Sequence, residues 1–101
     1  MMLQSKSEIA KWLDKYNIKN YTINDDLTVD VAGHVFLDNK GLATIPIQFG
    51  QVGGNFWCNN NKLKSLEGCP NVIRGGFYCA DKFKNDIEYL RWLFSKKVMA
   101  L

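Results

Sequence analysis

A 21-residue internal repeat runs through the middle of the chain and constrains its fold more than any other sequence feature. Three segments align with one another, beginning at Val31, Val52 and Ile73. Apolar residues recur at two further equivalent positions, the first occupied by Val35, Phe56 and Phe77 and the second by Leu37, Cys58 and Cys79. A short fixed period is typical of a solenoid, in which each unit buries its apolar face by stacking on its neighbours.

Length, charge and hydropathy narrow the class of protein further. The 101 residues predict one domain, residues 1–101, with a single modest core. The net charge of +3 comes from Lys and Arg residues that are scattered along the chain. This pattern is more typical of charges that keep a protein soluble than of a basic surface that binds nucleic acid. No stretch approaches the roughly 20 apolar residues that span a bilayer, and the N-terminal region lacks the apolar run of a signal peptide. We therefore expect a cytoplasmic protein with no membrane association.

Helices are expected at both ends of the repeats. Ser5 and Glu8 form a capping box, and an apolar stripe with helical spacing follows it, so residues 5–17 are predicted to be a helix. Residues 21–31 predict a β-hairpin, residues 31–83 the repeats, and residues 85–99 a second helix with Asn85 as its N-cap. The predicted fold is α+β, a short solenoid capped by a helix plus hairpin at one end and by a helix at the other.

The amino-acid pattern of the repeats resembles that of leucine-rich repeats. In the segment 56–63, Phe56 and Cys58 take the strand positions, Asn61 the asparagine position and Leu63 the following leucine. The stretches 21–31 and 61–70 look like those of short leucine-rich-repeat-like proteins of bacteriophages and prophages, and the similarity covers roughly residues 21–82. The resemblance implies a leucine-rich-repeat-like solenoid. It also implies a phage-encoded inhibitor or adaptor that engages a host or bacterial defence protein in the host-cell cytoplasm.

The candidate binding site follows from the alternation of side chains along a strand. In each apolar-x-apolar strand the middle residue faces away from the core, and these residues are Phe36, Trp57 and Tyr78. Parallel strands would stack them in register, about 4.8 Å apart, as an aromatic ladder. The flanking candidates for partner contact are His34, Asp38, Asn55 and Asn59. Three interpretations stay open: an exposed binding face, a second core under the helix at 85–99, or a homodimer interface.

The sequence offers no catalytic, metal or cofactor site. His34 and Asp38 share a strand face but would lie about 13 Å apart, and no nucleophile accompanies them. Cys58 and Cys79 occupy equivalent positions, yet no further ligand has the spacing of a metal site. An odd number of cysteines, three, also argues against a closed disulfide framework, so buried reduced thiols are expected.

Two functions are compatible with these features. The favoured one is a non-enzymatic protein-binding module that uses the aromatic face. The alternative is a single-stranded nucleic-acid-binding protein whose bases would stack on the same three rings. Nucleic acid is the less favoured partner, because none of the flanking positions carries a Lys or Arg.

Overall fold

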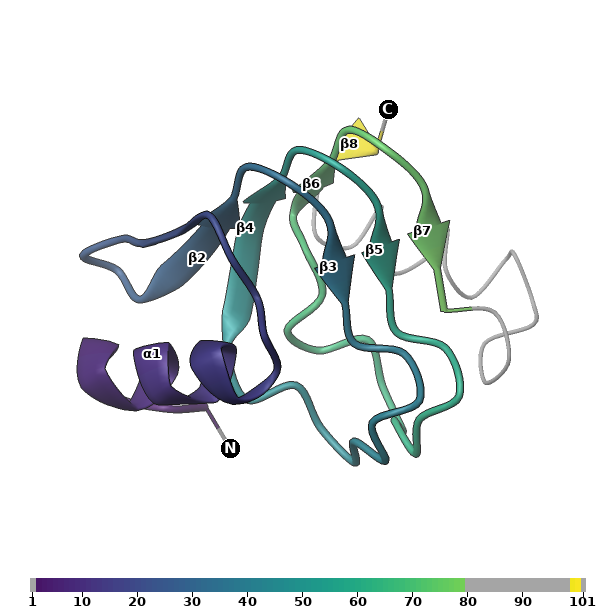
Figure 1. Cartoon of the computed structure of the whole chain (residues 1–101), viewed down its shortest axis with the longest axis horizontal. Helices are drawn as coiled ribbons and strands as arrows, with labels where there is room; N and C mark the ends of the chain where they lie inside the picture. Colours follow the sequence, from purple (N-terminus) through teal and green to yellow (C-terminus); the bar gives the residue numbers. More distant parts are fainter. Residues whose placement is uncertain (1, 80–98, 101) are drawn as a thin grey trace.

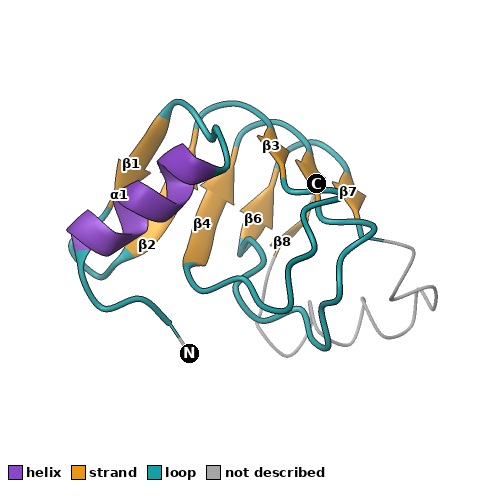
Figure 2. Cartoon of the chain, turned by 60° about the horizontal axis from the view of Figure 1, so that its bottom comes forward, coloured by secondary structure: helices purple, strands orange, loops and turns teal. Residues whose placement is uncertain are grey.

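The computed structural model describes residues 2–79 and 99–100, which form one helix and two β-sheets (Figures 1 and 2). The chain is therefore α+β. In chain order the elements are α1 (Lys6–Lys15), β1 (Tyr21–Ile23), β2 (Thr28–Val31), β3 (Val35–Phe36), β4 (Gln48–Val52), β5 (Phe56–Trp57), β6 (Val72–Ile73), β7 (Phe77–Tyr78) and β8 (Met99–Ala100).

Helix α1 lies within the region where the capping box predicts a helix. The Ser5 Oγ accepts a hydrogen bond from the Glu8 N–H at 3.2 Å, which satisfies one of the amides at the helix N-terminus. Ile9 and Leu13 are buried on the inner face of the helix. The helix ends where Asn17 adopts a positive φ of 57°, a conformation that asparagine tolerates better than most residues.

The strands form two sheets that share the 21-residue period. The larger sheet has the order β1-β2-β4-β6-β8, with β1 antiparallel to β2 and the other pairs parallel. The smaller sheet has the order β3-β5-β7 and is parallel throughout. Figure 1 shows β3, β5 and β7 side by side, each joined by a corner to the strand that precedes it. Val31, Val52 and Ile73 are register partners in the larger sheet.

The expectation of a leucine-rich-repeat-like solenoid is wrong. It assigned a single apolar-x-apolar strand to each unit, whereas each repeat contributes short strands to two different sheets. The prediction does not include β4 and β6 of the larger sheet. In β4, Gly50 disguises the strand pattern because glycine is depleted in strands. A side chain at Gly50 would collide with the Asp30 carboxylate, which accepts a hydrogen bond from the Gln51 N–H at 2.8 Å. The glycine thus makes room for a contact between strands.

The two predicted ends of the repeats have different outcomes. The hairpin expected over residues 21–31 is formed by β1 and β2, and it continues the larger sheet because β2 pairs directly with β4. The helix expected over residues 85–99 lies outside the described residues except at its end, where Met99 belongs to strand β8. Residues 80–83, the end of the predicted repeat region, also lie outside the described part of the chain.

Side chains from both sheets and from α1 meet in one hydrophobic core. Phe49 of β4 and Phe56 of β5 touch edge to face, with ring centroids 5.3 Å apart, and so join the two sheets. Phe56 in turn stacks on Phe77 of β7, with centroids 6.0 Å apart. Val29, Val35, Leu37 and Val52 are completely buried around them. Residues at equivalent positions of successive repeats therefore stack on one another inside the protein.

Asn61 holds the loops of two successive repeats together. Its side-chain Oδ1 accepts hydrogen bonds from the Lys40 and Leu42 N–H groups, both at 3.0 Å. Its Nδ2 donates to the Leu37 carbonyl at 2.7 Å and the Cys58 carbonyl at 3.1 Å. One amide side chain thus satisfies backbone groups that form no hydrogen bonds between strands. It constrains the positions of both loops strongly, because unpaired buried polar groups are costly.

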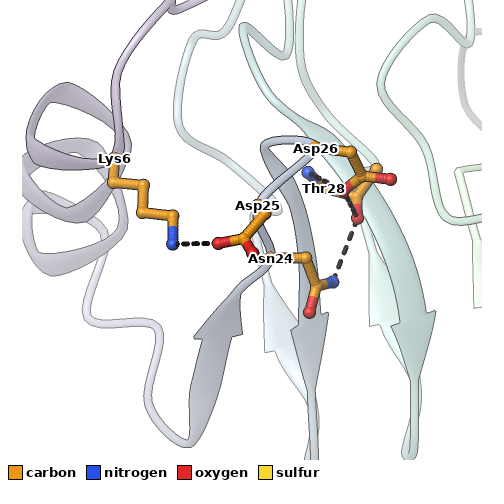
Figure 3. Close-up of polar contacts among 5 residues, drawn as sticks. All are labelled: Lys6, Asn24, Asp25, Asp26 and Thr28. Atoms are coloured by element: carbon orange, nitrogen blue, oxygen red, sulfur yellow. Dashed lines mark hydrogen bonds and ion pairs between the residues drawn. The ribbon is translucent and has the colours of Figure 1, made fainter.

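The hairpin turn is organised by charged and polar side chains (Figure 3). Thr28 donates to the Asp26 Oδ1 through its hydroxyl at 2.6 Å and its N–H at 3.1 Å. These bonds lower the pKa of Asp26. Lys6 of α1 forms an ion pair with Asp25 at 2.8 Å, and this hydrogen bond and the lysine charge lower the pKa of Asp25. The ion pair links the helix to the turn.

Stability at acid pH should depend on this turn. Because the pKa of each carboxyl is lowered in the folded protein, the stabilisation is present at neutral pH and is lost as the pH falls through the folded values, below about 4. Urea unfolding between pH 7 and 2 should show a shallower loss of stability in the double variant Asp25→Asn, Asp26→Asn than in the wild type. Parallel curves for the two proteins would contradict this assignment.

Asn61→Ala should lower the free energy of unfolding by about 3 kcal/mol, because several backbone groups lose their partner at once. Chemical denaturation measures the change. Lys62→Ala is the matched control: its side chain is exposed, and the expected change is within about 0.5 kcal/mol. Equal effects of the two substitutions would show that the Asn61 hydrogen bonds do not hold the loops.

Candidate binding surface

The three aromatic residues singled out by the repeat lie in one stack. Phe36, Trp57 and Tyr78 are register partners on β3, β5 and β7. The Phe36 and Trp57 ring centroids are 4.6 Å apart with planes at 8°, and those of Trp57 and Tyr78 are 5.2 Å apart at 13°. The predicted in-register ladder is confirmed. We call these three residues the aromatic ladder.

The aromatic ladder is exposed at both ends and half-buried in the middle. The residues Phe36 and Tyr78 are 54% and 46% exposed, and they are the exposed large hydrophobic residues of the described chain. With these fractions exposed, Phe36 and Tyr78 do not form a second buried core, and the helix at 85–99 that would cover them lies outside the described residues except at Met99. Trp57 lies between its neighbours and is partly covered by them.

Stacking decides which part of each ring is available to a partner. Both faces of the Trp57 ring are occupied by the rings of Phe36 and Tyr78. The ladder therefore offers solvent a ridge of ring edges, and only the outer faces of the end rings Phe36 and Tyr78 have no neighbour within the ladder. Offset stacking of this kind contributes roughly 0.5–1.5 kcal/mol per pair, so the rings are held in place before any partner arrives.

His34 and Asn55 support one side of the ladder. The His34 Nδ1 accepts a hydrogen bond from the Asn55 N–H at 2.9 Å, and the Asn55 Oδ1 accepts one from the Gly76 N–H at 2.7 Å. The His34 ring also contacts Phe36 and Trp57, with centroid distances of 5.9 and 5.8 Å. These side chains cross from one repeat to the next and fix the spacing of the rungs.

Asp38 and Asn59 lie beyond the other ends of the same strands. The Asp38 carboxylate accepts a hydrogen bond from the Asn39 Nδ2 at 3.2 Å. The Asn59 backbone carbonyl accepts a hydrogen bond from the Asn39 N–H at 3.0 Å. The buried side-chain Oδ1 of Asn59 has no hydrogen-bond partner among the described residues. No hydrogen bond joins Asp38 to His34 in the described part of the chain, so the structure does not bring these two together as a catalytic pair.

Cys58 and Cys79 form a disulfide, with their Cα atoms 4.7 Å apart. The expectation of reduced thiols is wrong: the parallel register of β5 and β7 places the two equivalent cysteines, which directly follow these strands, beside each other. Counting cysteines missed this pairing, because the third, Cys69, is buried and takes no part in the bond. No cluster of residues able to hold a metal ion occurs within residues 2–79 and 99–100.

A groove of about 280 Å³ lies on the larger sheet, and none of the three ladder residues lines it. Sequence reasoning missed it, although the same 21-residue spacing places Asp30 next to Gln51. The exposed Arg74 contributes a guanidinium that forms no ion pair with the described residues. The lining residues are Asn20, Thr22, Asp30, Val31, Ala32, Gln51, Gly53 and Arg74.

Comparisons with known proteins assign the chain to no family, so the candidate binding surface rests on the geometry described above. No protein-family model, curated protein or solved structure matches the chain. Among the described residues, no helix combines the length and apolar character needed to cross a bilayer.

Gly76 tests how the end of the ladder is positioned. A methyl group at Gly76 would lie 2.7 Å from the Tyr78 Cζ, so Gly76→Ala should push the Tyr78 ring off Trp57. We expect a changed near-ultraviolet circular dichroism spectrum with little change in the far-ultraviolet spectrum. Gly33→Ala is the control, because its added methyl group meets no atom closer than 4.0 Å. An unaltered aromatic signal in Gly76→Ala would count against the stacked arrangement.

Proposed function

We propose that the protein is a non-enzymatic binding module whose contact surface is the aromatic ladder. The observation that supports this most is a row of three stacked aromatic residues on a short parallel sheet, of which Phe36 and Tyr78 are exposed and Trp57 is half-buried. Tryptophan and tyrosine are enriched among the residues that dominate protein–protein binding energies. Large exposed apolar groups otherwise favour non-specific association, so their concentration in one ridge points to a partner.

The stack also reduces the entropic cost of binding. A free aromatic side chain on a surface loses rotamer freedom when a partner immobilises it. Here the rings of Phe36, Trp57 and Tyr78 already restrict one another, and His34 packs against two of them. A ridge of this shape suits an apolar groove on another protein, which would enclose the ring edges and displace water.

The type of partner comes from the resemblance to phage proteins. On that basis the chain is an inhibitor or adaptor that engages a host or bacterial defence protein in the host cytoplasm. The disagreement between the fold and a leucine-rich-repeat-like solenoid weakens this resemblance. The binding surface therefore rests on the geometry alone, and the choice of partner rests on the resemblance.

The nucleic-acid alternative receives less support from the ladder. Bases bind aromatic side chains face to face, and the two faces of Trp57 are already covered. The flanking side chains of His34, Asn55 and Asp38 also supply no permanent positive charge for a phosphate backbone. Both features favour a protein partner.

Trp57→Ala should leave the fold intact and weaken partner binding by at least about 30-fold, which corresponds to the roughly 2 kcal/mol of a hot-spot residue. The experiment is capture from bacterial lysate with quantitative mass spectrometry, comparing wild type and variant. Arg74→Ala is the control, because Arg74 is exposed and lies on the groove of the other sheet. It should capture the same protein as the wild type.

Two results would contradict the proposal. Equal capture by wild type and Trp57→Ala would remove the ladder from the binding surface. A loss of captured protein accompanied by a large fall in the thermal midpoint would make Trp57 a core residue instead. Sedimentation of the purified wild type adds a third test, since a dimer that Trp57→Ala dissociates would make the ladder a homodimer interface.

A further inference from the structure

The disulfide lies directly behind the aromatic ladder. Cys58 follows Trp57 and Cys79 follows Tyr78, so the bond joins two adjacent rungs at the position next to their rings. Both cysteines are almost completely buried, with 2% and 3% of their surface exposed. The cross-link therefore fixes the distance between the strands that carry Trp57 and Tyr78.

Non-covalent contacts hold the last rung together with the disulfide: Phe77 stacks on Phe56, Tyr78 stacks on Trp57, and the Gly76 N–H donates to the Asn55 Oδ1 at 2.7 Å. Strand β7 has two residues and lies at the edge of the smaller sheet among the described strands. The Gly76 carbonyl, directly before β7, accepts a hydrogen bond from the Phe56 N–H at 2.9 Å, and the Tyr78 carbonyl accepts one from the Cys58 N–H at 2.8 Å. Short strands at the edge of a sheet open locally at a lower free-energy cost than central strands. The disulfide is the one covalent constraint on this opening.

We propose that Cys58 and Cys79 are a thiol–disulfide modification site that sets the length of the aromatic ladder. In the oxidised protein, Tyr78 is held on Trp57 and the ladder has three rings. In the reduced protein the covalent link is lost, so β7 opens more often and the Tyr78 ring spends less time stacked on Trp57. The effect on partner binding rests on the proposed function, whereas the effect on the ladder does not.

The reactant is a low-molecular-weight disulfide such as oxidised glutathione. One cysteine thiolate attacks it, which releases one glutathione thiolate and leaves a mixed disulfide on the protein. The second cysteine thiolate then attacks the protein sulfur and releases the second glutathione thiolate. In total the two cysteine thiols lose two electrons and two protons, and the two glutathione molecules gain them. Excess reduced glutathione drives the same steps in reverse.

Burial and compartment make this site responsive. Thiolates need access to a sulfur atom, and both cysteines are buried, so reduction requires β7 to open first. A reducing cytoplasm keeps most protein thiols reduced, whereas an oxidising compartment or oxidative stress favours the disulfide. We expect this protein in the cytoplasm, yet two of its buried cysteines are paired. The oxidation state of Cys58 and Cys79 therefore changes when the redox conditions around the protein change.

Amide hydrogen exchange of the full-length, ¹⁵N-labelled protein tests the proposal without any partner. One sample is oxidised with oxidised glutathione and the other is reduced with excess dithiothreitol, and alkylation of the unfolded chains counts the thiols. The Phe56 and Cys58 amides donate to β7, whereas the Val35 and Leu37 amides join β3 to β5. Reduction should speed exchange of the first pair relative to the second by at least about tenfold.

Two variants serve as controls. Cys58→Ser with Cys79→Ser should exchange like the reduced protein under both conditions, and Cys69→Ala should respond like the wild type. Equal acceleration of both pairs of amides, including general unfolding on reduction, would overturn the proposal, as would no acceleration. A tenfold local effect together with Trp57→Ala that still captures its partner would retain the redox site and reject the proposed binding surface.

Discussion

Parallel pairing between residues 21 positions apart is the constraint on which the rest of this structure depends. It places equivalent side chains of successive repeats at the spacing between neighbouring strands, about 4.8 Å. Inside the protein this stacks Phe56 on Phe77, and outside it stacks Trp57 on Phe36 and Tyr78. Core and candidate binding surface are therefore two consequences of the same register.

Polar residues obey the same register and hold it in place. The contacts between His34 and Asn55 and between Asp30 and Gln51 each join residues 21 positions apart. Asn61 reaches back to the preceding repeat and pairs with its backbone. These bonds matter because the strands are short, so the hydrogen bonds between strands alone satisfy few of the backbone N–H and C=O groups.

Much of this arrangement follows from the sequence. The capping box at Ser5 and the periodicity of the repeat predict the first helix, the parallel register and the ladder. The division into two sheets was not predictable in this way, because Gly50 obscures β4 and the value of glycine there depends on the Asp30 carboxylate. The odd cysteine count and the expected reducing compartment predict free thiols, but the parallel register places Cys58 beside Cys79, where they form a disulfide.

The central claim is that the repeat register creates a preformed aromatic ridge. The most direct test is a nuclear Overhauser spectrum of the full-length protein, with assigned aromatic protons. The structure predicts cross-peaks from the Trp57 ring to the rings of both Phe36 and Tyr78, together with backbone contacts between residues 21 positions apart. Cross-peaks that indicate another register, or a Trp57 ring with no aromatic neighbour, would contradict the account.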